Sequence, residues 1–156
     1  MILEIQGDLL ETDCKLIGHG VNAQGIMGAG VAQSLCSRFK GLRFAYKSHC
    51  DLAFGSGAAP SDLLGNVYIV EVNRKFIANC FTQQNYGGRH QEYINYDALH
   101  HCVSALVSEM AAMGIKELAI PRIGCGLAGG NWERVKSIFE VYFNETSDLT
   151  LKVYSL

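Results

Sequence analysis

Two glycine-rich stretches decide the fold of this chain: Gly25-Ile-Met-Gly-Ala-Gly30, the first glycine loop, and Gly124-Cys-Gly-Leu-Ala-Gly-Gly130, the second glycine loop. Each follows an apolar run typical of a buried strand and leads into a stretch with helical spacing of apolar residues. The first N–H groups of a helix have no partner within the helix, and the helix dipole adds partial positive charge at that end. Such loops bind phosphate without a metal ion, so two of them predict a diphosphate ligand.

The segments around these loops alternate between strand-like and helix-like patterns. We expect strands over 2–6 (an edge strand), 15–21, 66–72, 76–82, 117–123 and 149–156, and helices over 30–39, 42–50, 93–113 and 132–143. A hairpin turn at 73–75 would make the third and fourth strands a central pair, a loop is expected over 54–60, and Gly114 should end the long helix.

This alternation predicts an α/β fold of three layers, with a mixed, mostly parallel central sheet and helices on both faces. Val31, Leu35 and Phe39 recur at helical spacing, which makes the stretch 15–39 a strand, loop and helix unit. In such folds the ligand binds beyond the carboxyl ends of the strands, where both glycine loops fall.

Composition limits the chain to one domain. A length of 156 residues with 49% hydrophobic content predicts a single domain over residues 1–156. The net charge of −2, from 13 basic and 15 acidic side chains, gives no general attraction for nucleic acid or for a membrane surface. We therefore expect a small-molecule ligand and no strong binding to nucleic acid.

The cysteines indicate a reducing compartment. All six occur singly, without CxxC pairs, and most lie in apolar runs, namely Cys14, Cys36, Cys50, Cys80, Cys102 and Cys125. They are therefore expected to be buried, with no metal site and no cofactor. The stretch from Met1 to Ile5 has the alternation of a strand and no basic region, and no apolar run has transmembrane length. A cytoplasmic location is expected, or a nuclear one in a eukaryote.

Two common phosphate-binding motifs do not fit. A Walker loop requires GxxxxGK[ST], and neither glycine loop has the Lys-Ser or Lys-Thr pair that would hold phosphate and magnesium. A dinucleotide-binding GxGxxG could start at Gly28, but Gln33 stands at the third glycine. Both nucleotide hydrolysis of the Walker type and a Rossmann site are disfavoured.

The chain instead resembles the macrodomain family, whose members bind ADP-ribose and related metabolites. Four motifs carry the resemblance: Gly7-Asp-Leu-Leu10, Val21-Asn-Ala23, Met27-Gly-Ala-Gly-Val-Ala32, and Ile120-Pro-Arg-Ile-Gly-Cys-Gly-Leu127 with Trp132 behind it. Their order and spacing cover nearly the whole chain. The last motif and Val153-Tyr-Ser-Leu156 are most similar to the branch with the terminal ADP-ribose glycohydrolase, the DNA ADP-ribosyl glycohydrolase antitoxin and the yeast-type ADP-ribose 1″-phosphate phosphatase.

The resemblance implies a set of ADP-ribose-binding residues. Asp8 would accept a hydrogen bond from the adenine amino group beside the Leu9 amide, unless Asp8 only caps a turn. Asn22 would contact the distal ribose, unless it is a strand-end cap, and Tyr154 and Leu156 would pack near adenine, unless the tyrosine is simply core. The two loops would hold the phosphates and the distal ribose through Met27, Gly28, Ala29, Gly30, Gly124, Cys125, Gly126 and Leu127.

The resemblance also bears on catalysis. In the two glycohydrolases of this branch a lysine occupies the position of Gln83, and in the terminal ADP-ribose glycohydrolase an aspartate occupies the position of Ala128. Neither glutamine nor alanine can form a Schiff base or accept a proton at neutral pH, which argues against lysine-dependent glycohydrolase activity. Cys125 is not expected to be a nucleophile, because no histidine is near it in sequence.

The segment Cys80-Phe-Thr-Gln-Gln-Asn-Tyr-Gly-Gly88 and His19 are similar to the phosphatase. We therefore expect hydrolysis of ADP-ribose 1″-phosphate, with His19 and Asn22 as the catalytic residues and His19 as general acid or base. Alternatively, His19 is a core histidine bonded to a backbone carbonyl. Tyr86, Gly87 and Gly88 form either a lid or a turn.

Three functions thus stay open at this point. The first is the phosphatase, and the second is a non-catalytic reader or sensor of ADP-ribose. The third is a hydrolase of ADP-ribosyl or O-acetyl-ADP-ribose groups that uses substrate-assisted water. The expected partners are ADP-ribose or ADP-ribose 1″-phosphate, and ADP-ribosylated macromolecules in addition.

Overall fold

The fold is built around one six-stranded sheet. The computed structural model describes residues 1–87 and 91–156. The strands are β1 (Ile2–Gln6), β2 (Leu16–Asn22), β3 (Val67–Val72), β4 (Lys75–Gln83), β5 (Glu117–Ile120) and β6 (Thr150–Ser155), in the spatial order β1-β6-β5-β2-β4-β3. All neighbours run parallel except β3 and β4. The predicted mixed, mostly parallel sheet is confirmed.

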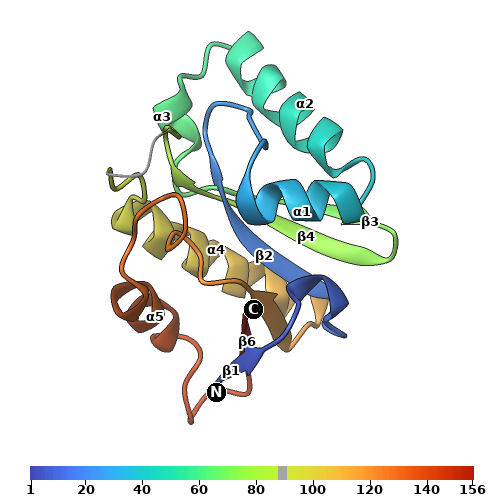
Figure 1. Cartoon of the computed structure of the whole chain (residues 1–156), viewed down its shortest axis with the longest axis vertical. Coiled ribbons are helices and arrows are strands. Elements are labelled where there is room, and N and C mark those ends of the chain that lie inside the picture. The colour runs from blue at the N-terminus through green and yellow to red at the C-terminus, as the bar shows by residue number, and fades with distance from the viewer. Residues whose placement is uncertain (88–90) are drawn as a thin grey trace.

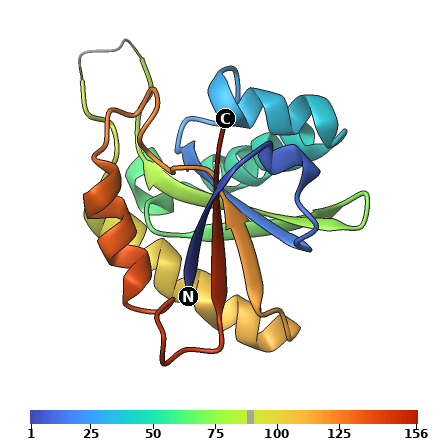
Figure 2. The ribbon, with the colours of Figure 1, turned by 60° about the horizontal axis from the view of Figure 1, so that its bottom comes forward.

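Helices cover both faces of the sheet. They are α1 (Gly30–Arg38), α2 (Leu42–Gly55), the single turn α3 (Pro60–Leu63), α4 (Tyr96–Met113) and α5 (Trp132–Glu140), with a 3₁₀ turn over Leu9–Glu11. Figure 1 shows α1 in front of β4, α2 above α1, and α4 behind β2. The turned view in Figure 2 shows α1 and α2 on one side of the strands and α4 and α5 on the other. The predicted three-layer α/β/α fold is confirmed.

The core has two halves because successive side chains of a strand point to opposite faces. In β2, Leu16 packs with the α4 and α5 side, whereas Ile17 packs with the α1 and α2 side. Both side chains are fully buried. A central strand covered on both faces therefore reads as a continuous apolar run, which is why 15–21 was recognisable in the sequence.

The hairpin between β3 and β4 is tighter than the sequence predicts. Only Asn73 and Arg74 lie in the turn, with φ of 51° and 67°, which is the conformation that joins two strands through two residues. The expectation that both strands are central is wrong for β3, which is the edge of the sheet. Its long apolar run is half-buried because one of its edges has no strand partner.

Several element bounds also differ. α2 continues to Gly55, five residues beyond the predicted end and into the predicted loop 54–60. The short helix α3, which begins at Pro60, was not predicted. β5 ends at Ile120, because Pro121 cannot donate to the ladder. α4 begins at Tyr96, where the Asn95 side chain accepts a hydrogen bond from the Ala98 N–H, and ends at Gly114 with φ of 69°, as predicted. In the described part of the chain no helix has the length and apolarity needed to cross a membrane.

Candidate functional site

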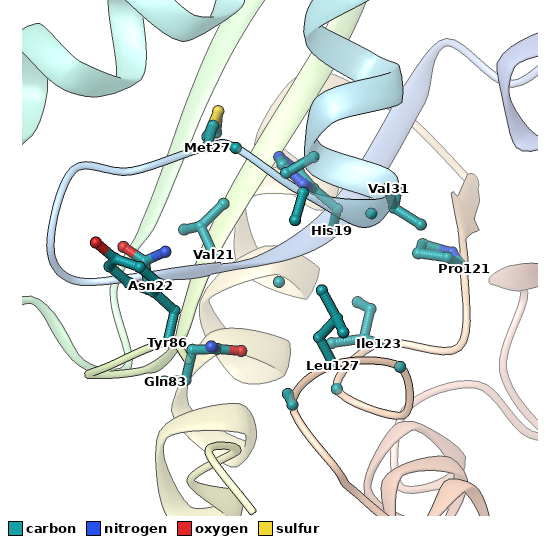
Figure 3. A pocket seen from close by; sticks show the side chains of 18 of the residues that line it. His19, Val21, Asn22, Met27, Val31, Gln83, Tyr86, Pro121, Ile123 and Leu127 are labelled. Carbon is teal, nitrogen blue, oxygen red and sulfur yellow. The ribbon is translucent and has the colours of Figure 1, made fainter. Parts of the chain in front are cut away.

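A cavity of about 870 Å³ lies between the two glycine loops, beyond the carboxyl ends of β2 and β5. Its volume falls in the range of roughly 300–1,000 Å³ common for small-molecule sites. Figure 3 shows Met27 and Val31 from the first loop and α1 on one side, and Ile123 and Leu127 on the other. The lining residues are His19, Gly20, Val21, Asn22, Ile26, Met27, Gly28, Ala29, Gly30, Val31, Ala32, Gln83, Tyr86, Pro121, Arg122, Ile123, Gly124, Gly126, Leu127, Ala128 and Gly129.

The first glycine loop presents a helix N-terminus to the cavity. α1 begins at Gly30, and its N-cap Ala29 has no side chain able to accept a hydrogen bond from the first turn. No residue in the described ranges accepts a hydrogen bond from the N–H groups of Gly28 or Ala29. Val31, in the first turn of α1, is 40% exposed and lines the cavity. The loop can therefore bind an anion as the sequence predicts.

The second glycine loop is folded back on itself. The Gly130 N–H donates to the Gly124 carbonyl at 2.6 Å, and the Ala128 carbonyl accepts from the Tyr93 N–H at 2.7 Å. Gly124 has φ of 76°, and a Cβ there would collide with the Ile94 side chain, so glycine is required. Within the described ranges no acceptor binds the N–H groups of Gly126 and Leu127, and both residues line the cavity.

Asn22 holds the first glycine loop through its side chain. Its Nδ2 donates to the Ile26 carbonyl at 2.7 Å, and its Oδ1 accepts from the Gln24 N–H at 2.9 Å. Asn22 is therefore a strand-end cap, the alternative considered from the sequence, and its amide also lines the cavity. One hydrogen of Nδ2 remains for a ligand.

Two residues of α2 also support this loop, and neither was predicted as a site residue. The Tyr46 hydroxyl donates to the Asn22 carbonyl at 2.6 Å, and burial raises the pKa of this tyrosine. Arg43 donates to the Met27 carbonyl through Nε at 3.2 Å and Nη2 at 2.9 Å. The one available signal was a tyrosine at helical spacing from Leu42 and Cys50, because a buried hydroxyl requires a partner.

His19 lines the cavity from the middle of β2 and is only 1% exposed. Its Nε2 lies 2.7 Å from Oδ1 of Asn79, while its Nδ1 is buried without a hydrogen-bond partner in the described ranges. Burial lowers its pKa to about 4. The expected alternative of a backbone carbonyl partner is wrong, since the partner is an amide side chain. A neutral ring at pH 7 does not fit the expected role of general acid, whereas its free nitrogen can accept a proton.

The positions that carry catalytic groups in the resembled glycohydrolases both face the cavity. Gln83 and Ala128 line it, and Gln83 donates from Nε2 to the Asn85 carbonyl at 2.7 Å. The β2–β4 register shifts here, so that Asn22 pairs with Gln83 while Val21 pairs with Phe81. Such a bulge re-aims side chains beside a site. Tyr86 lines the cavity and is 54% exposed, while Gly88 lies outside the described residues.

The residues assigned to adenine lie apart from the lining of this cavity. Asp8 accepts a hydrogen bond from the Leu10 N–H at 2.9 Å and caps the 3₁₀ turn, and Leu9 is buried. The Tyr154 hydroxyl bonds to Thr12 Oγ1 at 2.9 Å, and Leu156 is 97% exposed. They meet at the ends of β1 and β6, the edge of the sheet that also carries the glycine loops. Their contact with adenine stays a prediction.

Cys125 points away from the cavity. Its Sγ lies 3.4 Å from the Ile123 carbonyl and its side chain packs against the core, so burial raises the pKa of the thiol. A raised thiol pKa disfavours the thiolate, which agrees with the expectation that this residue is not a nucleophile.

The cavity wall has little charge. Among its described lining residues Arg122 is the one with a permanent charge, and no carboxylate is present. The Arg122 guanidinium lies 5.7 Å from the Trp132 ring centroid and 3.5 Å from a Glu4 oxygen. A wall of N–H donors without acidic side chains suits an anionic ligand.

The family model described as "Macro domain" matches residues 19–139, a range that contains β2 and both glycine loops. The chain belongs to the macrodomain family. This confirms the family to which the sequence motifs point.

Individual macrodomains provide points of comparison. The human ADP-ribose glycohydrolase OARD1 is 27% identical over 99% of this chain and 91% of its own length. An ADP-ribose 1″-phosphate phosphatase of Scheffersomyces stipitis is 25% identical over 99% of both chains. The solved macrodomain of Mycobacterium tuberculosis DarG superposes with a TM-score of 0.83 at 24% identity, over 100% of this chain and 98% of the other, which shows the shared fold.

Proposed function

We propose that this macrodomain binds ADP-ribose in the cavity between its glycine loops and hydrolyses ADP-ribose 1″-phosphate to ADP-ribose and phosphate. Family membership and two curated relatives with names of hydrolases that act on ADP-ribose derivatives support the general class of activity. The observation that carries the finer proposal is His19, a buried cavity-lining histidine with one free ring nitrogen.

The binding part rests on the N–H donors of the two loops. Gly28 and Ala29 on one side and Gly126 and Leu127 on the other can each donate to a phosphate oxygen. Charge-assisted hydrogen bonds contribute roughly 1.5–3 kcal/mol each, and about 8 kcal/mol corresponds to a micromolar Kd. Four such bonds contribute about 6–12 kcal/mol before the entropy of association is subtracted, so apolar contacts with the cavity wall must supply the rest of micromolar binding.

The catalytic part assigns the free nitrogen of His19 to a water molecule. The water oxygen would form a bond to phosphorus, the bond between phosphorus and O1″ would break, and the water proton would pass through Nδ1 to the departing O1″. Asn22 would orient the distal ribose with its remaining Nδ2 hydrogen. Because Nδ1 is covered in the structure, this role requires the cavity wall to shift when the substrate binds.

A phosphate-release assay tests the proposal. ADP-ribose 1″-phosphate is incubated with the wild type and with His19→Gln, whose amide can still donate to Asn79, and ADP-ribose binding is followed by calorimetry. We expect turnover by the wild type and a loss of about 100-fold or more in the variant, with similar ADP-ribose affinity. Equal turnover by the two proteins would remove His19 from the mechanism.

A second candidate, a non-catalytic ADP-ribose reader, is favoured by one specific observation. His19 is 1% exposed, and its pKa of about 4 leaves no proton to donate at neutral pH. Gln83 and Ala128 likewise supply no acid or base to the cavity. Calorimetric binding of ADP-ribose together with no phosphate release would decide for the reader.

A further inference from the structure

His19 has a hydrogen-bond partner on the neighbouring strand, Asn79, which has no role in the proposed function. His19 and Asn79 are register partners on the parallel strands β2 and β4, and Asn79 is fully buried. Side chains at paired positions of adjacent strands lie on the same face of a sheet, which brings the Asn79 amide against the imidazole. The distance from Asn79 Oδ1 to His19 Nε2 is 2.7 Å.

The orientation of the Asn79 amide is fixed from its other side. Its Nδ2 donates to the backbone carbonyl of Tyr68 at 3.0 Å, and Tyr68 is its register partner on β3. Turning the amide over would place two oxygens at that distance, without a hydrogen between them. The backbone of β3 therefore determines that Oδ1 of Asn79 faces His19.

This orientation determines the tautomer of His19. A neutral imidazole has one N–H donor and one acceptor nitrogen, and the acceptor Oδ1 of Asn79 requires the hydrogen on Nε2. The lone pair is consequently on Nδ1, the buried atom without a described partner. In the opposite tautomer, His19 Nε2 and Asn79 Oδ1 would both be acceptors and would lie 2.7 Å apart without a hydrogen between them.

We propose that Asn79 is a positioning residue that holds His19 in the Nε2–H tautomer and so reserves Nδ1 as the hydrogen-bond acceptor of the site. Its role in turnover rests on the proposed function, whereas its effect on the tautomer does not. Asn79 does not line the cavity, so it acts through His19 and not on the ligand.

Two substitutions at this position have opposite chemical effects. Asn79→Asp keeps an acceptor and nearly the same volume, but its carboxylate favours the doubly protonated imidazolium and turns Nδ1 into a donor. Asn79→Leu keeps the volume and removes the acceptor, so that the tautomer is no longer selected. Thr82→Val on the same strand is the matched control, because its buried hydroxyl has no partner in the described part of the chain.

Two-bond ¹H–¹⁵N correlation spectra of the imidazoles at neutral pH report the tautomer directly. The chain has five histidines, and the signals of His19 are identified by their absence in His19→Gln. We expect the Nε2–H tautomer in the wild type and in Thr82→Val, an imidazolium in Asn79→Asp, and loss of the single tautomer in Asn79→Leu. A wild-type spectrum with the hydrogen on Nδ1 would overturn the inference.

Phosphate release from ADP-ribose 1″-phosphate gives the second measurement. Both Asn79 variants should lose at least about tenfold in kcat while ADP-ribose affinity stays within about threefold, and Thr82→Val should match the wild type. An Asn79→Asp protein with a neutral His19 ring and unchanged turnover would contradict the inference. If the wild type releases no phosphate, the phosphatase proposal fails, and the spectra alone decide whether Asn79 fixes the tautomer.

Discussion

The Tyr46 hydroxyl donates a hydrogen bond of 2.6 Å to the backbone carbonyl of Asn22, and so joins α2 to the last residue of β2. The same hydroxyl lies 3.1 Å from Oδ1 of Asn22, the atom that also accepts from the Gln24 N–H. Tyr46 is fully buried, so water cannot replace this donor. The start of the first glycine loop thus depends on a helix that does not line the cavity.

Tyr46→Phe should therefore destabilise the protein by about 1–3 kcal/mol, because it leaves a buried carbonyl unpaired. Denaturant unfolding monitored by circular dichroism measures the change. Tyr142→Phe is the control, since no described residue bonds to that hydroxyl, and it should stay within about 0.5 kcal/mol of the wild type. Equal free energies of unfolding for both variants would contradict the role of Tyr46.

Arg43→Gln should weaken ADP-ribose binding by about three- to tenfold, because both donors to the Met27 carbonyl are lost and the first glycine loop is held less firmly. Calorimetric titration gives the affinity. Lys47→Gln on the same helix removes only an exposed ion pair with Asp51 and should leave the affinity unchanged. A Kd of Arg43→Gln equal to that of Lys47→Gln would show that the arginine does not position the loop.

Gly124→Ala should destabilise the protein by about 1–3 kcal/mol and weaken ADP-ribose binding at least about tenfold. A Cβ at this residue would collide with Ile94 and would stand at φ of 76°. Gly126→Ala is the matched control for stability alone, because a Cβ there meets no atom of the protein within 4 Å. Thermal unfolding of the two variants distinguishes them, and a wild-type Tm for Gly124→Ala would refute the stated requirement for glycine.

The protein should lose stability as the pH falls from about 7 to about 4. Burial lowers the pKa of His19 from 6.5 to about 4, so the unfolded chain binds a proton in this interval while the folded chain does not. The lost free energy of unfolding is about 3 kcal/mol for this residue.

Urea unfolding at a series of pH values, for the wild type and His19→Gln, isolates this contribution. The comparison between the wild type and His19→Gln is needed because burial also lowers the pKa of His49. Between pH 7 and pH 4 the wild type should lose about 3 kcal/mol more stability than His19→Gln. Parallel profiles would mean that His19 titrates normally in the folded protein.

Local patterns in the sequence were sufficient to predict the layers of the fold and both glycine loops. Apolar runs, helical spacing and a helix-ending glycine such as Gly114 are read from residues close together in the sequence. The strands, helices and helix end that they predict were confirmed. The edge position of β3 was not predictable, because a half-buried edge strand and a buried central strand can share the same apolar run.

The glycine loops that line the cavity were predictable from the sequence, whereas the residues that hold the site in place were not. Met27, Gly28 and Leu127 belong to short motifs and do line the cavity. Asn79 and Tyr46 contact the site across 60 and 24 residues of sequence, so no local pattern indicates them. The pKa of His19 depends on burial, which only the packed structure reveals.

A calorimetric titration of the wild-type protein with ADP-ribose tests directly whether the cavity between the glycine loops is an ADP-ribose site. The N–H donors of the two glycine loops, together with apolar contacts in the cavity, predict one ADP-ribose per chain with a Kd in the micromolar range, about 8 kcal/mol of binding free energy. The Gly124→Ala protein should bind at least about tenfold more weakly. If a folded wild-type protein does not bind ADP-ribose at about 1 mM, the cavity between the glycine loops is not an ADP-ribose site.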